Sequence, residues 1–295
     1  MTRRVLPSTA TTILVASLVL ISPSHADMVF KYKSSSVDGM TSGAKASVSP
    51  ECQDSDNVGT VGASRGCGGM LIVDNEMLRS SAGPHASPGG GYATRGGGNR
   101  SFNVRHDGVT YTFADSEHNV FTGQVTRMDH MFMDTGFDED IGYWDTSGVE
   151  SMHFMFAGNS DFDQDIGPWD VSSVNNMSAM FKNAYGFDQD IGSWDVSNVI
   201  NMGHMFMGAF GFSADISTWD VSSARYMGSM FKKASGFNVD IGSWDTSGAS
   251  SMVYMFRDNW RFNQDLSSWD VSNVSNATGF AWGSDMNSAD VPNFD

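Results

Sequence analysis

The stretch FDQDIGSWDVSNV, residues 187–199, recurs along the chain with small changes and decides how the rest of the sequence is interpreted. Trp-Asp pairs begin at positions 144, 169, 194, 219, 244 and 269, so the period is constant (169 − 144 = 25). A period this strict is the signature of a repeat architecture, in which each unit buries its apolar face against its neighbours. The repeat must therefore be explained before any single motif is given a function.

The repeat that begins at Trp194 contains two kinds of apolar pattern. Four residues have the helical spacing i, i+3, i+4 and i+7, which predicts a short helical turn: Met202, Met205, Phe206 and Ala209. The segment 212–219 contains Ile216 and is followed by an Asp-Val-Ser turn signal, so it is predicted to be extended. The same apolar positions in all copies predict a core of stacked tryptophan, methionine and phenylalanine columns.

These patterns predict a repeat solenoid of the leucine-rich-repeat-like class, with one short extended segment and one short helical turn per 25-residue rung. The alternative is a parallel β-helix with three short strands per rung. A β-propeller is excluded, because its blades need about 40 to 45 residues.

The formal net charge of the chain is −17, and its distribution is uneven. Residues 121–295 hold 24 acidic and 7 basic side chains, whereas residues 27–120 hold 10 and 8. The repeat region alone therefore carries 7 − 24 = −17. This excess of negative charge argues against nucleic acid or an anionic membrane as a partner.

Residues 1–26 are expected to be a signal peptide. Arg3 and Arg4 form the positive start, an apolar run follows at 13–21, and Ser24-His25-Ala26 supplies a small-residue cleavage site. No cysteine follows that site to carry a lipid anchor, and no later run is apolar over the roughly 20 residues that a membrane span requires. We therefore expect an exported protein with no membrane insertion.

Cys52 and Cys67 are the only cysteines. In an oxidising compartment such a pair most simply forms a disulfide, here across a Gly/Ser-rich loop. Two free buried thiols are the alternative, and a metal site lacks the paired histidines that it would need nearby.

Five segments are expected along the chain: a signal peptide (1–26), a loosely structured Gly/Ser-rich region with the disulfide (27–100), an N-terminal cap and half repeat (101–136), the solenoid with six Trp-Asp units (137–282), and a tail (283–295). Within the second segment, the run MLIV at 70–73 is the one expected strand. In the third, Val104, Val109, Tyr111 and Phe113 suggest one or two short strands.

Units such as FDQDIGSWDVSNVINMGHMF, residues 187–206, resemble the repeats of BspA-like leucine-rich-repeat surface proteins, which also occur in mycoplasma-type lipoproteins. The resemblance covers roughly residues 120 to 282 in six copies. It implies an exported bacterial repeat protein, often displayed on the cell surface, with adhesion and host or matrix binding in some relatives. Departures from the pattern are Pro168, Ala214, and Ala277 with Phe280 at the methionine positions.

Two columns of aspartates run through the repeats. One contains Asp140, Asp165, Asp190, Asp215, Asp240 and Asp265, and the other contains Asp145, Asp170, Asp195, Asp220, Asp245 and Asp270. At a rung spacing of about 4.8 Å, each neighbouring pair of charges would cost about 3 kcal/mol at an effective dielectric constant of 20. Either each carboxylate accepts N–H bonds within its own turn, which the Asp-x-Ser sequence favours, or Ca2+ bridges the first column.

The paired aspartates also resemble the two carboxylates of a glycosidase. Such a pair needs one member with its own environment and a divergent pKa, and a sixfold repeated pair offers none. His130, His153 and His204 are expected to share no column and have no evident ligand spacing, so we expect surface or half-buried roles for them. No catalytic residue and no cofactor other than a possible Ca2+ is predicted.

Positions that vary between the copies point to a different surface. Just after the predicted helical turn, five of the seven basic residues of the repeat region gather with three aromatic residues: Lys182, Tyr185, Phe210, Lys232, Lys233, Arg257, Trp260 and Arg261. We call this set the basic–aromatic strip. It is either an ordinary solvated surface, in which long side chains cover apolar groups, or a partner-binding site, since aromatic residues and arginine are enriched at interfaces.

Taken together, the sequence predicts an exported, non-enzymatic repeat protein of the bacterial cell surface or medium, with the periplasm as a further location. Its expected activity is cell-surface adhesion or the binding of an extracellular protein or glycan through the basic–aromatic strip. The alternatives are an acidic, calcium-linked structural component of the envelope and a polysaccharide-active enzyme. The repeat pattern does not specify an oligomeric state.

Overall fold

The structure, a computed structural model, describes residues 71–74, 103–106, 109–112 and 120–294. Every described residue belongs to the same compact unit of the chain. The predicted signal peptide and the proposed Cys52–Cys67 pair lie outside the described residues.

Four short strands precede the repeats. β1 (Leu71–Asp74) pairs in parallel with β4 (Val120–Gln124), and β2 (Asn103–His106) pairs antiparallel with β3 (Val109–Thr112). Strands are therefore present where the run at 70–73 and the alternation around β2 and β3 predicted them. Immediately after β4, the first coil of the repeat region begins.

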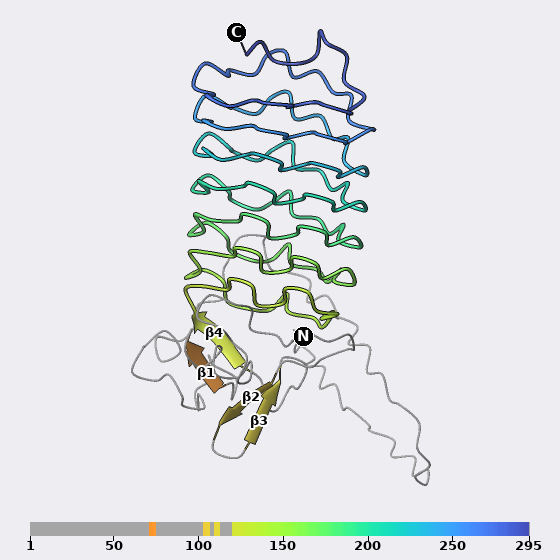
Figure 1. Ribbon diagram of the computed structural model, residues 1–295. Coiled ribbons are helices and arrows are strands. Elements are labelled where there is room, and N and C mark those ends of the chain that lie inside the picture. Colours follow the sequence, from red (N-terminus) through yellow and green to blue (C-terminus); the bar gives the residue numbers. More distant parts are fainter. Residues whose placement is uncertain (1–70, 75–102, 107–108, 113–119, 295) are drawn as a thin grey trace, which may run out of the picture. The chain divides into compact units, whose positions relative to one another are not determined.

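From residue 125 onward the chain winds in successive coils that lie one above another (Figure 1). We call each coil a rung. A column of isolated parallel β-bridges connects neighbouring rungs at one position of the repeat: Arg127, Ser151, Asn176, Asn201, Tyr226, Ser251 and Asn276. The first step of this column, from Arg127 to Ser151, is one position shorter than the later steps, which all keep the period of the Trp-Asp pairs. The described part of the first rung is therefore one position out of step with the later period.

The segment predicted to be a helical turn forms consecutive tight turns, and the described residues contain no α-helix. In the rung of Met177, alternate N–H groups donate to carbonyls of the next rung, as in Met177 to Asn201 (2.9 Å) and Ala179 to Gly203 (2.9 Å). The intervening N–H groups close i to i−3 turns, as in Met180 to Met177 (3.1 Å). An α-helix would direct all of these N–H groups along its own axis, which would leave the neighbouring rung without partners.

Residues in the left-handed backbone conformation occur at regular intervals and allow the N–H groups to alternate between the next rung and their own turn. Two positions in each rung have positive φ, for example Ala179 (55°) and Asn183 (57°), and the second follows one four-residue turn unit after the first. Asparagine and glycine suit this conformation, and Gly208 (72°) occupies the position of Asn183 in the next rung. A four-residue repeat of the backbone also turns positions i, i+3, i+4 and i+7 inward, which is why the apolar spacing imitates a helix.

The core consists of the columns that the sequence repeats without change. Phe181 is fully buried, stacks on Phe187 of its own rung at 3.9 Å between ring centroids, and stacks on Phe206 of the next rung at 5.7 Å. The methionines between these rings are equally buried, as at Met180 and Met205. Every added rung thus extends the same aromatic and thioether ladder.

The tryptophans of the six Trp-Asp pairs close one side of this core and are only 3–5% exposed. Each indole N–H from Trp169 to Trp269 donates to a carbonyl of the preceding rung, for example Trp194 to Ile166 at 3.1 Å. The prediction that the tryptophan column belongs to the core is confirmed, and its rings form no exposed carbohydrate platform. The leucine-rich-repeat-like class, with a parallel β-helix as the alternative, stays a prediction.

Candidate functional site

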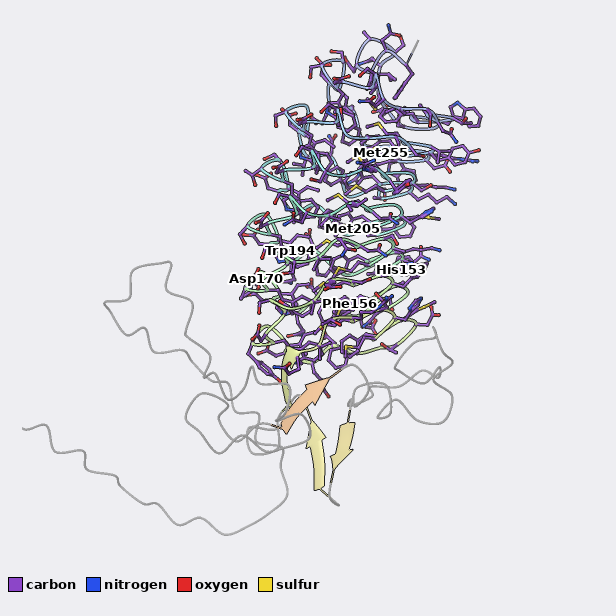
Figure 2. All side chains as sticks on the ribbon, turned by 90° about the vertical axis from the view of Figure 1, so that its left-hand side faces the viewer. His153, Phe156, Asp170, Trp194, Met205 and Met255 are labelled. Carbon is purple, nitrogen blue, oxygen red and sulfur yellow. The ribbon has the colours of Figure 1, made fainter. Side chains whose placement is uncertain are left out.

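Figure 2 shows that Asp170, a member of the second aspartate column, and His153 lie at different edges of the stack. Asp170 lies at one edge, His153 lies at the opposite edge, and Phe156, Trp194 and Met205 lie between them. The lysines of the strip share the edge of His153, because they belong to the same consecutive turns in their own rungs. The structure therefore gives the two kinds of charge separate surfaces.

At the acidic edge, each aspartate closes its own turn. In the first column, the carboxylate of Asp140, Asp165, Asp190, Asp215, Asp240 or Asp265 accepts the N–H of the residue two positions later at 2.9–3.1 Å. In the second column, the N–H of the serine two positions on donates in the same way, and in five of these turns its hydroxyl donates as well, as in Ser197 to Asp195 (3.1 and 2.6 Å). The turn hydrogen bonds that the Asp-x-Ser sequence predicted are present.

These bonds also set the electrostatics of the acidic edge. The hydroxyl and then the backbone N–H of Ser222 hold the pKa of Asp220 below its ordinary value. For Asp245, the bonds from Ser247 lower the pKa, although the neighbouring charges of Asp220 and Asp270 act in the opposite direction. Nowhere in the described ranges do three or more acidic, histidine or cysteine side chains form a group suited to a metal ion.

At the opposite edge, the cations of the strip lie over aromatic rings of neighbouring turns. The ammonium group of Lys182 lies 5.6 Å from the ring centre of Phe154, one rung below. Lys232 lies 5.5 Å from the ring of Tyr254, one rung above. Because a cation is attracted to the face of an aromatic ring, these contacts hold the lysines along the strip.

Arg257 continues this arrangement towards the end of the stack. Its guanidinium group lies 4.9 Å from the ring of Tyr254 and 6.0 Å from that of Trp282. It also forms an ion pair with Asp258 at 3.5 Å. Sequence reasoning misses these rings, because Phe154 and Tyr254 occur within the segment that the apolar spacing predicts to be a helical turn.

The histidines belong to the same surface, and the expectation that they share no column is wrong for two of them. His130, Phe154, His204 and Tyr254 all occupy the position two residues after the first methionine of their rungs, with φ between 55° and 59°. The shorter first step hides this relation, since it places His130 one position out of the alignment of the later rungs. His130 stacks on Phe154 with 5.3 Å between ring centroids and 4° between planes.

His204 belongs to the rung between those of Lys182 and Lys232. Burial lowers the pKa of His204 from its ordinary value, and the positive charges of Lys182 and Lys232 lower it further. At neutral pH this imidazole is therefore more strongly biased towards its neutral form than a free histidine. The positive charge of the strip therefore comes from its lysines and arginines.

A buried polar cluster joins the first two rungs of the stack. Asp129 is 8% exposed and accepts hydrogen bonds from the side chains of Arg127 and Ser151 and from the N–H of His153. Burial by itself would raise the pKa of Asp129, but the hydrogen bonds from Ser151 and Arg127 outweigh it and lower the pKa. The carboxylate is thus fully engaged in holding two rungs together, and its serine donates to it rather than to a histidine.

The three aromatic residues of the strip occupy one position of the repeat, which we call the outer aromatic column. In successive rungs this position holds Ser160, Tyr185, Phe210, Ser235 and Trp260. Tyr185 and Phe210 stack with 5.2 Å between ring centroids and 7° between planes, and they are 48% and 49% exposed. Trp260 is 65% exposed. Lys233 and Arg261 are exposed beside this column, and neither forms an ion pair within the described ranges.

A chain of stacked, nearly identical coils is a repeat protein. It belongs to the family described as "Mycoplasma protein of unknown function, DUF285", whose pattern matches residues 106–213 and 189–294. The comparisons with curated proteins and with solved structures gave no match. In the described part of the chain, no helix is long and apolar enough to cross a bilayer.

Proposed function

We propose that this chain is an exported, non-enzymatic binding protein of the BspA-like leucine-rich-repeat type. Its basic–aromatic strip contacts a protein or a glycan outside the cytoplasm. The observation that carries the proposal is the contrast between columns: core and turn residues recur from rung to rung, whereas the side chains of the strip differ at almost every step. Packing along a stack requires the same residue at each buried position. Exposed positions are free of this requirement, and different side chains there can form a specific recognition surface.

The geometry of the strip supports this role. Three of its five cations, Lys182, Lys232 and Arg257, are held over aromatic rings, so that less rotamer freedom is lost when a partner binds them. Three large rings of the strip remain about half exposed or more: Tyr185, Phe210 and Trp260. Aromatic residues and arginine are enriched at interfaces, and tryptophan, tyrosine and arginine contribute most to interface energies.

A catalytic function is not part of the proposal. The paired aspartates are occupied by hydrogen bonds within their own turns, and they repeat in the same form along the stack. A glycosidase needs two carboxyl groups with different pKa values across a cleft. The repetition gives neither a unique pair nor a unique environment.

A retention experiment on extracellular proteins and glycans tests the proposal. The full chain is compared with the combined variant Tyr185→Ala, Phe210→Ala and Trp260→Ala, and we expect the variant to lose at least one partner. The matched control removes three similarly exposed apolar side chains outside the strip, Tyr143→Ala, Ile200→Ala and Tyr226→Ala, which are 46%, 43% and 51% exposed. Equal retention of every partner by both variants would refute the role of the strip.

A further inference from the structure

The outer aromatic column is interrupted once. It contains rings at Tyr185 and Phe210, a serine at Ser235, and a ring again at Trp260. One residue of the column comes from each rung, because these positions follow the period of the Trp-Asp pairs. The interruption at Ser235 is therefore one rung high and lies between two rungs that each present a large exposed ring.

The spacing of the column fits one ring per rung. Tyr185 and Phe210 stack nearly in parallel, with 5.2 Å between centroids. In the core, the corresponding repeat between Phe181, Phe206 and Phe231 is 5.7 and 5.8 Å. Offset or parallel aromatic pairs are favourable over this range of centroid distances. A single ring at the height of Ser235 would thus stand one stacking distance from the rung of Phe210 and one from the rung of Trp260.

The rings on both sides of the interruption remain available. Phe210 stacks on Tyr185 on one side and is nevertheless 49% exposed. Trp260, at 65% exposed, contacts no other aromatic ring in the described ranges. At this position of the column the rung has only a serine hydroxymethyl group, which is too small to cover either face. Large exposed rings of this kind contribute binding energy once a partner ring removes them from water.

The charges around the interruption define the occupant further. Lys233 lies two residues before Ser235 on the same rung, and Arg261 directly follows Trp260. Both are exposed, and the acidic residue in these two turns, Asp258, is paired with Arg257 at 3.5 Å. The surroundings are therefore locally positive on a chain that is strongly acidic overall. An occupant with negative charges beside its ring fits this position.

From this juxtaposition we infer that the Ser235 interruption receives one aromatic side chain from an acidic peptide segment of a partner protein. The ring inserts at the height of Ser235, between Phe210 and Trp260, and the flanking carboxylates face Lys233 and Arg261. The inference rests on the proposed binding function and names its ligand class. An acidic peptide segment is favoured over a neutral sugar because exposed Lys233 and Arg261 complement negative charge beside the inserted ring.

A peptide titration tests the inference. The probe is a pentapeptide with a central tyrosine and two glutamates on each side, and its binding to the full chain is measured by calorimetry. The variant Ser235→Phe places a ring of the chain itself in the interruption, so we expect its affinity for the probe to fall by about tenfold or more. The matched control is Ser160→Phe. It adds the same ring at the end of the column, where Tyr185 is the ring on one side only, and it should leave the affinity unchanged.

Other outcomes would overturn the inference. Unchanged affinity in Ser235→Phe would do so, as would equal losses in Ser235→Phe and Ser160→Phe. Equal binding of a probe with leucine in place of tyrosine would show that no ring is recognised, and tighter binding of a neutral oligosaccharide would assign the strip to glycans. The proposed function is judged separately: it stands if the triple alanine variant loses a partner that Ser235→Phe retains, and in that case only the peptide inference falls.

Discussion

Phe206 and Phe210 belong to the same rung and are four positions apart, yet they represent two different regions of the molecule. Phe206 is fully buried and stacks on Phe181 and Phe231 of the neighbouring rungs, in a column where the same residue recurs. Phe210 is 49% exposed, and its column changes from serine to tyrosine, phenylalanine and tryptophan. The contrast teaches that repetition in this chain marks stability, and that variation marks the surface on which selection for binding can act.

The largest expected effect separates these two phenylalanines. Phe206→Ala should lower the free energy of unfolding by about 3–5 kcal/mol, because it removes a buried ring from a packed ladder. Phe210→Ala should change it by about 0.5 kcal/mol or less, since the ring is half exposed. Urea denaturation followed by circular dichroism measures both. Similar losses in the two variants would contradict the division between core and strip.

The second test compares the acidic edge with the opposite edge by lowering the pH. Hydrogen bonds from serine hydroxyls and backbone N–H groups lower the pKa values of several turn carboxylates: Asp215, Asp220, Asp245 and Asp265. A group with a lowered pKa binds fewer protons in the folded chain than in the unfolded one. Its stabilisation is present above the unfolded pKa, about 3.9 for aspartate, and is lost as the pH falls through the folded pKa.

The same sign applies at the opposite edge, where burial lowers the pKa values of His130, His153 and His204. Their contribution declines below the unfolded histidine pKa of about 6.5. The melting temperature should therefore fall in two stages, a smaller one below about pH 6.5 from the histidines and a larger one below about pH 4 from the carboxylates. A melting temperature that increased on acidification below pH 4 would be inconsistent with turn capping.

Addition of Ca2+ at pH 7 is the control for the acidic edge. No shift of the melting temperature is expected, because the turn bonds already engage the carboxylates. A rise with Ca2+ would instead favour the bridged aspartate column.

The smallest effect is expected at His204, within the strip. Replacing Lys232 by methionine removes one of the charges that lower the pKa of His204, so this pKa should move back towards its ordinary value. The matched control is Lys233→Met, one residue later on the same rung, because Lys233 is not among the charges that act on this imidazole. An NMR titration of the imidazole measures both variants. Equal shifts of the His204 pKa in the two variants would contradict a specific effect of Lys232 on this imidazole.

Several parts of this structure could be predicted from the sequence, because repetition reports packing directly. The 25-residue period, the buried tryptophan and phenylalanine columns and the aspartate turns all follow from residues that recur at one position. The grouping of basic residues at one edge could also be anticipated, since it needs only the period. These inferences required no knowledge of the backbone conformation.

The consecutive turns could not be predicted, because apolar residues at i, i+3, i+4 and i+7 fit both an α-helix and a four-residue turn repeat. The signal that separates the two is the position six residues after the first methionine of a rung, where Gly158, Asn183 and Gly208 have positive φ. The rings of Phe154 and Tyr254 under the cations escape prediction for the same reason. The relation between His130 and His204 is hidden by a single-position offset at the first step of the stack.

The hydrogen bonds between coils have a consequence for how such a chain can change its length. Within the described stack, these backbone bonds join each rung to the rung directly before or after it, as in Met177 to Asn201. Insertion or deletion of one complete repeat therefore leaves every internal ladder continuous and alters only how many coils there are. Recombination between similar repeats can then add or remove a single position of the outer column, and with it one ring or one charge. The shorter step after Arg127 limits this exchange to the rungs that follow it.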